Sequence, residues 1–327
     1  MIALSCHSSS FRLKVNLLLL IALIVSTSGC VVWGQTNPQI ASWQERIAQD
    51  LVSIRTAEQQ RLPEAQQGAL WAQLALEYQS VADFPKAEDA YNRALHLLKM
   101  APSARAKYAA TLDNLSTLYM SYGRVDDAES ATRQALAERQ KLGDLSDIGL
   151  SQVHLADIAL VRHQFKKAEQ LAQRAIQSMQ SSPDPPRAGL LSAFITLTYA
   201  RCSRNHCKEG IESAEQAVAF AGKEFEPESV AAGFALETLG FAKWKSGDPQ
   251  DGEKAMLQAI QMLRAKLATN DPRLAGAMLQ YRTYLIETNR QAEARDIQQQ
   301  VKTMVRQAGV YCSACAISVH SLSDSLR

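Results

Sequence analysis

The sequence predicts an all-α solenoid, a linear stack of about six helix–turn–helix repeats. A spacing of large and small residues begins at Trp71 and reads W-x2-L-A-x2-Y-x8-A-x3-Y-x2-A. It recurs about every 42 residues, and no alternating apolar run has the length of a strand. Because one helix pair can bury its apolar face only against a neighbour, the repeats are expected to stack. The positions equivalent to Trp71 are Leu112, Gln152, Phe194, Leu236 and Met278.

Breaker residues divide each repeat into two helices and separate one repeat from the next. In Gly247-Asp248-Pro249, glycine can end one helix, aspartate can cap the next and proline can occupy its first turn. Most linkers between repeats contain proline, as at Pro102 and Pro272, and one contains Gly143 instead. These signals place a solenoid over residues 67–308, with repeats starting near residues 67, 108, 148, 190, 232 and 274.

The segments just before and just after the repeats differ in composition and in the structure that they predict. Residues 35–66 contain Ile47, Leu51 and Ile54 at helical spacing, which predicts a leading helix that covers the first repeat. Residues 309–327 form a tail rich in serine that contains two cysteines.

The repeats resemble those of the tetratricopeptide repeat (TPR) family. The resemblance covers about residues 67–308, and the long period is similar to that of the kinesin-light-chain-like subclass. Two stretches are especially similar, residues 123–129 (GRVDDAE) and 289–294 (NRQAEA). The resemblance implies a right-handed superhelix whose first helices line a concave, partner-binding groove.

The N-terminus has the layout of a secretory signal. Arg12 and Lys14 precede an apolar run from Val15 to Val25, and small residues follow. We expect an exported protein, periplasmic or secreted, whose residues 1–34 are a cleaved signal peptide. A lipoprotein signal that lipidates Cys30 is one alternative, because Ser28-Gly29-Cys30 resembles a lipobox, and an uncleaved anchor is another.

Charge and motifs exclude several classes of function. The chain has a net charge of +2, and residues 1–34 contribute two basic and no acidic residues, so the remainder is neutral. A neutral solenoid without a basic stripe is a poor nucleic-acid binder. The sequence contains no phosphate-binding loop, dinucleotide fingerprint, nucleophile elbow or H-E-x-x-H motif. We therefore expect neither an enzyme nor a cofactor.

Four cysteines lie beyond the N-terminal segment. Cys202 and Cys207 flank one tight turn, where an exported protein could oxidise them to a disulfide. Cys312 and Cys315 form a C-x-x-C pair in the tail, a candidate for a local disulfide or for redox chemistry. A zinc site that uses both pairs is less favoured, because two repeats separate them, and no metal site is predicted.

The candidate binding residues lie on the first helices of repeats four and five. Helical phase places them on the concave face, where aromatic side chains commonly anchor partners. The sequence thus predicts a non-enzymatic scaffold that binds a peptide or helix of a partner protein. The alternatives are a structural lipoprotein of an envelope complex and a redox or metal-binding protein, while packing in the core is the competing interpretation of the aromatics. The groove candidates are Ile195, Tyr199, Phe234, Glu237, Phe241 and Trp244.

Overall fold

The chain folds into an array of antiparallel helix pairs. The computed structural model describes residues 38–80, 83–121, 123–267, 269 and 271–309, and these contain helices and no strand. The predicted signal segment, 1–34, lies outside the described residues, and so does the predicted tail, 309–327, except for Gly309, which is the last residue of the final helix. A leading helix, α2 (Pro38–Gln59), packs against the first pair, and Ile54 of this helix is buried.

Each repeat contributes a first helix and a second helix that pack against each other. The first helices are α3 (Glu64–Ser80), α5 (Arg105–Ser121), α7 (Leu145–Val161), α9 (Arg187–Ser203), α11 (Val230–Lys245) and α13 (Pro272–Glu287). The second helices are α4 (Phe84–Met100), α6 (Val125–Leu142), α8 (Phe165–Gln180), α10 (Cys207–Glu224), α12 (Pro249–Lys266) and α14 (Gln291–Gly309). A short 3-10 turn, η2 (Pro102–Ala104), joins the first two repeats. The all-α solenoid with a leading helix is therefore confirmed.

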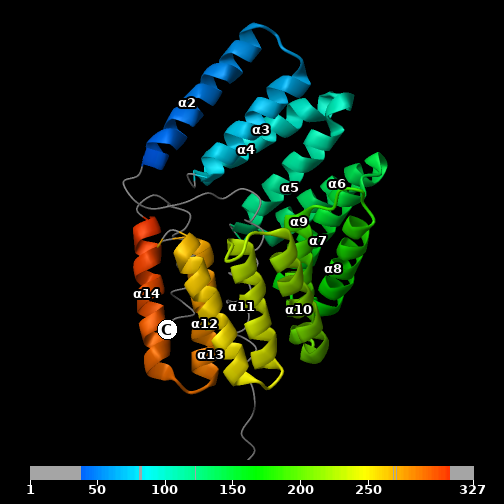
Figure 1. Ribbon diagram of the computed structural model, residues 1–327. Coiled ribbons are helices and arrows are strands. Elements are labelled where there is room, and N and C mark those ends of the chain that lie inside the picture. Colours follow the sequence, from blue (N-terminus) through cyan, green and yellow to red (C-terminus); the bar gives the residue numbers. More distant parts are fainter. Residues whose placement is uncertain (1–37, 81–82, 122, 268, 270, 310–327) are drawn as a thin grey trace, which may run out of the picture.

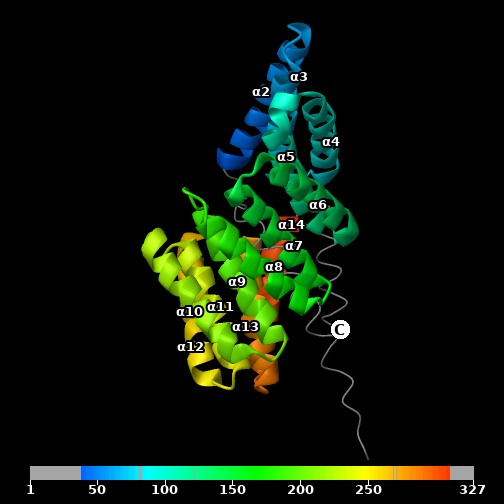
Figure 2. The same ribbon diagram turned by 90° about the vertical axis from the view of Figure 1, so that its right-hand side faces the viewer.

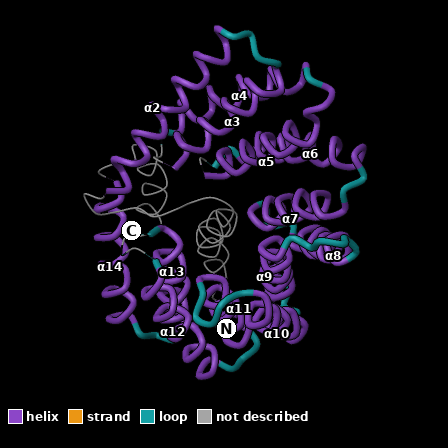
Figure 3. The backbone as a smooth tube through the Cα atoms, turned by 45° about the horizontal axis from the view of Figure 1, so that its top comes forward, coloured by secondary structure: helices purple, strands orange, loops and turns teal. Residues whose placement is uncertain are grey.

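The pairs follow a curved, superhelical path. Helices α2 to α4 lie at one end of the molecule and α11 to α14 at the other (Figures 1 and 2). Each first helix also contacts the first helix of the next repeat, so these helices line the inner side of the curve (Figure 3). We call their inward side the inner face.

The helices begin and end at the capping and helix-breaking residues that the sequence predicts. Asp248 precedes α12, and its side chain accepts a hydrogen bond from the backbone N–H of Asp251. Pro249 occupies the first turn of that helix, and Gly247 has φ of +101°, a conformation that suits glycine. Gly143 at the end of α6 has φ of +76°.

Small residues let the two helices of a repeat approach closely. Gly240 on α11 faces Gly252 on α12, and a Cβ placed on Gly252 would lie 2.8 Å from the carbonyl oxygen of Gly240. Ala75, Ala87 and Ala94 are fully buried in the first repeat. The alternation of small and large residues in the sequence thus determines how closely the two helices of a pair can pack.

Ion pairs connect neighbouring repeats near the turns between paired helices. The fifth residue of four second helices is a glutamate that pairs with an arginine in the turn of the next repeat. The pairs are Glu88–Arg124, Glu129–Arg162, Glu169–Arg204 and Glu253–Arg290. In α10 the fifth residue is Ile211. It packs against buried apolar residues instead of forming this type of ion pair.

No described helix combines the length with the apolar character that crossing a lipid bilayer would require.

Candidate binding site on the inner face

The six groove candidates lie on two adjacent first helices and are all buried. Ile195 and Tyr199 belong to α9, and the other four belong to α11. Between 1% and 8% of each residue's surface is exposed: Ile195 4%, Tyr199 1%, Phe234 7%, Glu237 2%, Phe241 8% and Trp244 8%.

The aromatic candidates pack against one another across repeats four to six. The ring of Tyr199 lies 4.7 Å from that of Phe241, measured between centroids, and Phe241 lies 6.0 Å from Trp244. Trp244 in turn contacts Tyr284 of α13 edge to face, at 5.5 Å. Packing between first helices therefore explains why these three rings are buried. Their role as partner anchors stays a prediction.

Ile195 and Phe234 line a cavity one helical turn away from this aromatic packing. The cavity has a volume of about 290 Å³ and lies between the N-terminal halves of α9 and α11. Leu191 and Val230 add to its apolar wall, and Arg273 of α13 contributes a polar group. Such a cavity suits one apolar side chain of a bound molecule.

Two buried acidic side chains join successive first helices. Tyr199 donates a hydrogen bond of 3.0 Å to Oε2 of Glu237, and Thr196 donates one of 2.7 Å to Oδ1 of Asp157. In each carboxyl group the second oxygen is buried without a hydrogen-bond partner. Burial raises the pKa of Asp157 and that of Glu237 to about 7. Both groups therefore change charge near neutral pH.

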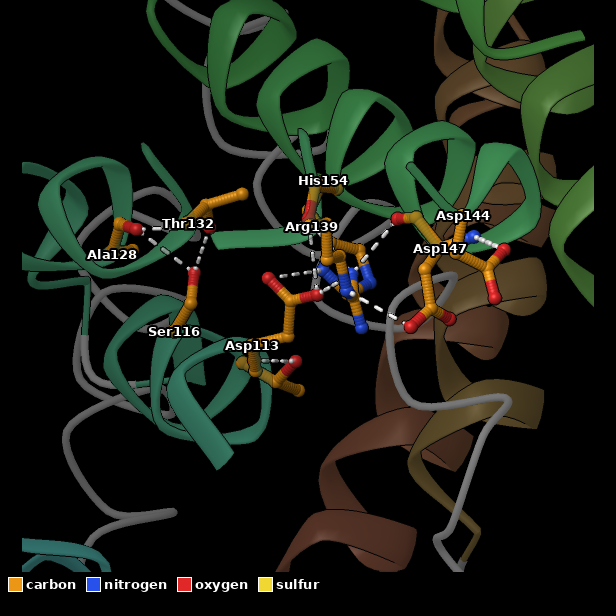
Figure 4. A network of polar contacts seen from close by, with 10 residues as sticks. Asp113, Ser116, Ala128, Thr132, Arg139, Asp144, Asp147 and His154 are labelled. Atoms are coloured by element: carbon orange, nitrogen blue, oxygen red, sulfur yellow. Dashed lines mark hydrogen bonds and ion pairs between the residues drawn. The ribbon is translucent and has the colours of Figure 1, made fainter. Parts of the chain in front are cut away.

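A third buried acid, Asp113 of α5, forms a charged network between repeats two and three (Figure 4). It pairs with the guanidinium group of Arg139, which also donates hydrogen bonds to the Ser151 hydroxyl at 2.7 Å and to the Asp147 carbonyl at 3.0 Å. The Nδ1 atom of His154 lies 3.6 Å from Oδ1 of Asp113. Burial lowers the pKa of His154, but the charge of Asp113, its hydrogen bond with His154 and the charge of Asp157 together raise that pKa by more, so the net shift is upward.

Sequence reasoning missed Arg139, although the repeat register contained a signal. Arg139 occupies the slot that other second helices fill with a buried apolar residue. A charged residue in that slot indicates a polar junction between repeats. The apolar equivalents are Leu98, Met179, Ala221 and Leu263.

The structure brings the first cysteine pair together as free thiols. Cys202 and Cys207 are both buried, and the Cys207 thiol donates a hydrogen bond of 3.7 Å to the carbonyl oxygen of Cys202. A hydrogen bond with the Cys207 thiol and burial both raise the pKa of Cys202. The predicted disulfide is thus not formed in this structure.

The other cysteine candidates are outside the part of the chain that is described. These are Cys30, Cys312 and Cys315. Within the described ranges, no three His, Cys, Asp or Glu side chains gather as the ligands of a metal ion would.

Comparison with known proteins identifies the fold. Neither the protein-family models nor the curated proteins gave a match. Among solved structures, the chain is similar to BtubC (BKLC) from P. vanneervenii, with 21% identity, coverage of 68% of this chain and 91% of that chain, and a TM-score of 0.57. The apo form of RapI has 12% identity, coverage of 81% and 93%, and a TM-score of 0.67.

A Rap protein complexed with competence and sporulation factor matches over nearly the whole length of both chains. Its identity is 15%, its coverage is 97% of this chain and 98% of that chain, and its TM-score is 0.56. At these identities the comparisons establish the architecture and not the activity. Together with the repeat spacing and the six helix pairs, they identify the chain as a TPR-like repeat protein in its fold.

Proposed function

We propose that the chain is a non-enzymatic interaction scaffold that holds a peptide or helical segment of a partner protein against its inner face. The observation that carries the proposal is the apolar cavity between α9 and α11, because Ile195 and Phe234, two residues chosen from the sequence, line it. A structure of similar fold, the Rap protein, is known in complex with competence and sporulation factor, which supports the assignment by analogy.

Site-specific photo-crosslinking tests this placement. A photoreactive phenylalanine analogue replaces Ser192 or Ala231, two partly exposed residues of the cavity wall, and in a control it replaces exposed Gln173 on the second helix α8. We expect the two inner positions to capture the same partner segment and the outer position not to capture it.

A cavity-filling variant tests whether the cross-link depends on the cavity. Ala231→Phe fills the cavity and should remove the cross-link formed at position 192, while the folded protein keeps its helical circular dichroism. Capture at the outer position alone, or capture unaffected by the filled cavity, would move the binding surface away from repeats four and five.

Export is part of the proposal and rests on the N-terminal sequence. We propose that residues 1–34 direct the chain out of the cytoplasm and are then removed. The alternative, a structural lipoprotein tethered through Cys30, predicts an acylated N-terminal cysteine on the mature protein. Mass spectrometry of the mature N-terminus separates the two, because acylation adds a mass that simple cleavage does not.

A further inference from the structure

Repeat four has a pair of thiols where the neighbouring repeats have apolar side chains. Cys202 lies in the last turn of α9, and Cys207 is the first residue of α10. The exposed fractions of the two cysteines are 6% and 8%. The equivalent residues of repeats two and three belong to the main hydrophobic core or pack against it; they are Met120 with Val125 and Leu160 with Phe165. Packing at these positions therefore does not require cysteine, and the two thiols add chemistry to repeat four alone.

Backbone hydrogen bonds fix the turn that separates the two cysteines. The N–H of Asn205 donates to the carbonyl oxygen of Cys202 at 3.0 Å, and the N–H of His206 donates to that of Arg201 at 2.9 Å. Asn205 has φ of +63°, which lets the chain reverse direction in a short turn. The turn therefore holds the end of α9 and the start of α10 in a fixed relation.

The two sulfur atoms lie across this turn from each other. A Cβ placed on Gly210 would lie 2.6 Å from Sγ of Cys202, so the sulfur of Cys202 reaches over α10, one turn beyond Cys207. In the opposite direction, the Cys207 thiol donates a hydrogen bond of 3.7 Å to the carbonyl oxygen of Cys202, and the two thiols also form a hydrogen bond with each other. A disulfide requires two cysteines whose side chains face each other at short range, and these two meet that condition.

We propose that Cys202 and Cys207 form a reversible redox site, in which a small disulfide compound such as oxidised glutathione converts the two thiols into one intramolecular disulfide bond. The bond joins the end of α9 to the start of α10, and the structure holds the reduced form of the site. The inference does not depend on the proposed function, because it concerns only the thiols of repeat four.

Cys207 is the thiol that reacts first. A hydrogen bond with the Cys202 thiol lowers the pKa of Cys207, burial opposes this effect, and the positive charge of Lys245 adds to the lowering. The same hydrogen bond and burial both raise the pKa of Cys202. Cys207 also lies between exposed His206 and Lys208, on the solvent side of the turn. The more acidic thiol is therefore also the one whose neighbours in the chain are exposed.

The reaction consists of two exchanges in which atoms and electrons balance. The Cys207 thiolate attacks one sulfur of the small disulfide, forms a mixed disulfide and releases the other half as a thiolate. The Cys202 sulfur, after loss of its proton, attacks Sγ of Cys207 and releases the second thiolate. The chain gives up two electrons and two protons, and the disulfide compound is reduced to two thiols.

Equilibration of the full chain with mixtures of reduced and oxidised glutathione tests the site. After alkylation of the remaining thiols, trypsin produces the peptides 202–204 and 205–208, which stay linked only when the bond has formed. Mass spectrometry of this linked pair gives the oxidised fraction and, from it, the effective concentration of one thiol at the other. The measurement is made on the unaltered chain and on a variant in which serine replaces Cys6, Cys30, Cys312 and Cys315.

Folding should favour the bond. We expect an effective concentration about tenfold or more higher in buffer than in concentrated urea, because the turn holds the thiols together only in the folded chain. The exchange variant Cys202→Ser/Ser203→Cys keeps the composition but moves one thiol to the next residue of α9, which projects in another direction, and it should lose this enhancement. With the partner thiol removed, Cys207 in Cys202→Ser should form a mixed disulfide with glutathione faster than Cys202 does in Cys207→Ser.

Three outcomes would overturn the inference. They are an effective concentration no higher in buffer than in urea, an equal enhancement in the exchange variant, and preferential linkage of either cysteine to Cys312 or Cys315 in the unaltered chain. Equal rates of mixed-disulfide formation in the two single variants would contradict the order of attack. Circular dichroism of each variant in buffer ensures that folded chains are compared.

Discussion

The substitution Glu237→Gln is expected to stabilise the folded protein at neutral and alkaline pH. Glutamine has nearly the same shape and keeps an oxygen that accepts the hydrogen bond from Tyr199. It removes a buried group whose ionisation the interior opposes. The gain should therefore depend on pH in a manner set by the pKa of Glu237.

The magnitude follows from the difference in pKa between the two states. Burial raises the pKa of Glu237 to about 7 in the folded protein, whereas a glutamate in the unfolded chain has a pKa of about 4.3. Between these values the folded state retains a proton that the unfolded state has released, so the free energy of unfolding falls by about 1.4 kcal/mol for each pH unit. The loss is on the order of 3 kcal/mol at pH 7, where the folded group is half ionised, and it levels off near 4 kcal/mol at about pH 8.

Urea denaturation of the original protein and the variant at pH 5, 6, 7 and 8 measures the effect. Tryptophan fluorescence, to which buried Trp244 on α11 contributes, reports unfolding. We expect the stability difference to be small at pH 5 and to grow up to about pH 7. Glu226→Gln, at an exposed position in the loop before α11, controls for the lost charge. A difference that is the same at every pH would refute the reasoning.

Three further substitutions test the packing and the capping. Gly252→Ala places a methyl group 2.8 Å from the Gly240 carbonyl oxygen and should lower the free energy of unfolding by about 1 to 3 kcal/mol, measured by thermal or urea denaturation. The control Gly222→Ala, with open space around the new methyl group, should not destabilise the fold. Arg139→Met leaves Asp113 buried without its cation and should cost about 3 to 5 kcal/mol. The double variant Asp113→Val/Arg139→Met should recover most of that loss, and a double-mutant cycle that is simply additive would contradict the pairing. Asp248→Ala should cost about 1 kcal/mol through the lost helix cap, seen as a lower urea midpoint.

The repeat architecture could be predicted because its cause is local and periodic. Proline, glycine and aspartate at the turns fix where helices begin and end, as at Gly247 and Asp248. The first helices of the six pairs begin two or three residues before the positions predicted from the spacing. This offset is small because the first turn of a helix precedes its first packing residue.

The exposure of the candidate site could not be predicted. Helical phase places Tyr199 and Phe241 on the inner side of their helices, and the structure puts them on adjacent first helices in direct contact. Whether such a side chain faces a groove or a neighbouring ring depends on the distance between α9 and α11. That distance is set by all the small residues that pack the repeats together, so no single position in the sequence encodes it.

The sequence by itself determined the helix pairs, their order and their stacking, since a repeated pattern of small and large residues can be satisfied only by similar neighbours. Only the tertiary structure decided which side chains meet across repeats. Asp113 and Glu237 occupy equivalent slots in their repeats, yet one binds the guanidinium group of Arg139 and the other accepts a hydrogen bond from a tyrosine. The reason is physical: the partners of these two buried acids lie 26 and 38 residues away in the chain, and their proximity is a property of the assembled array.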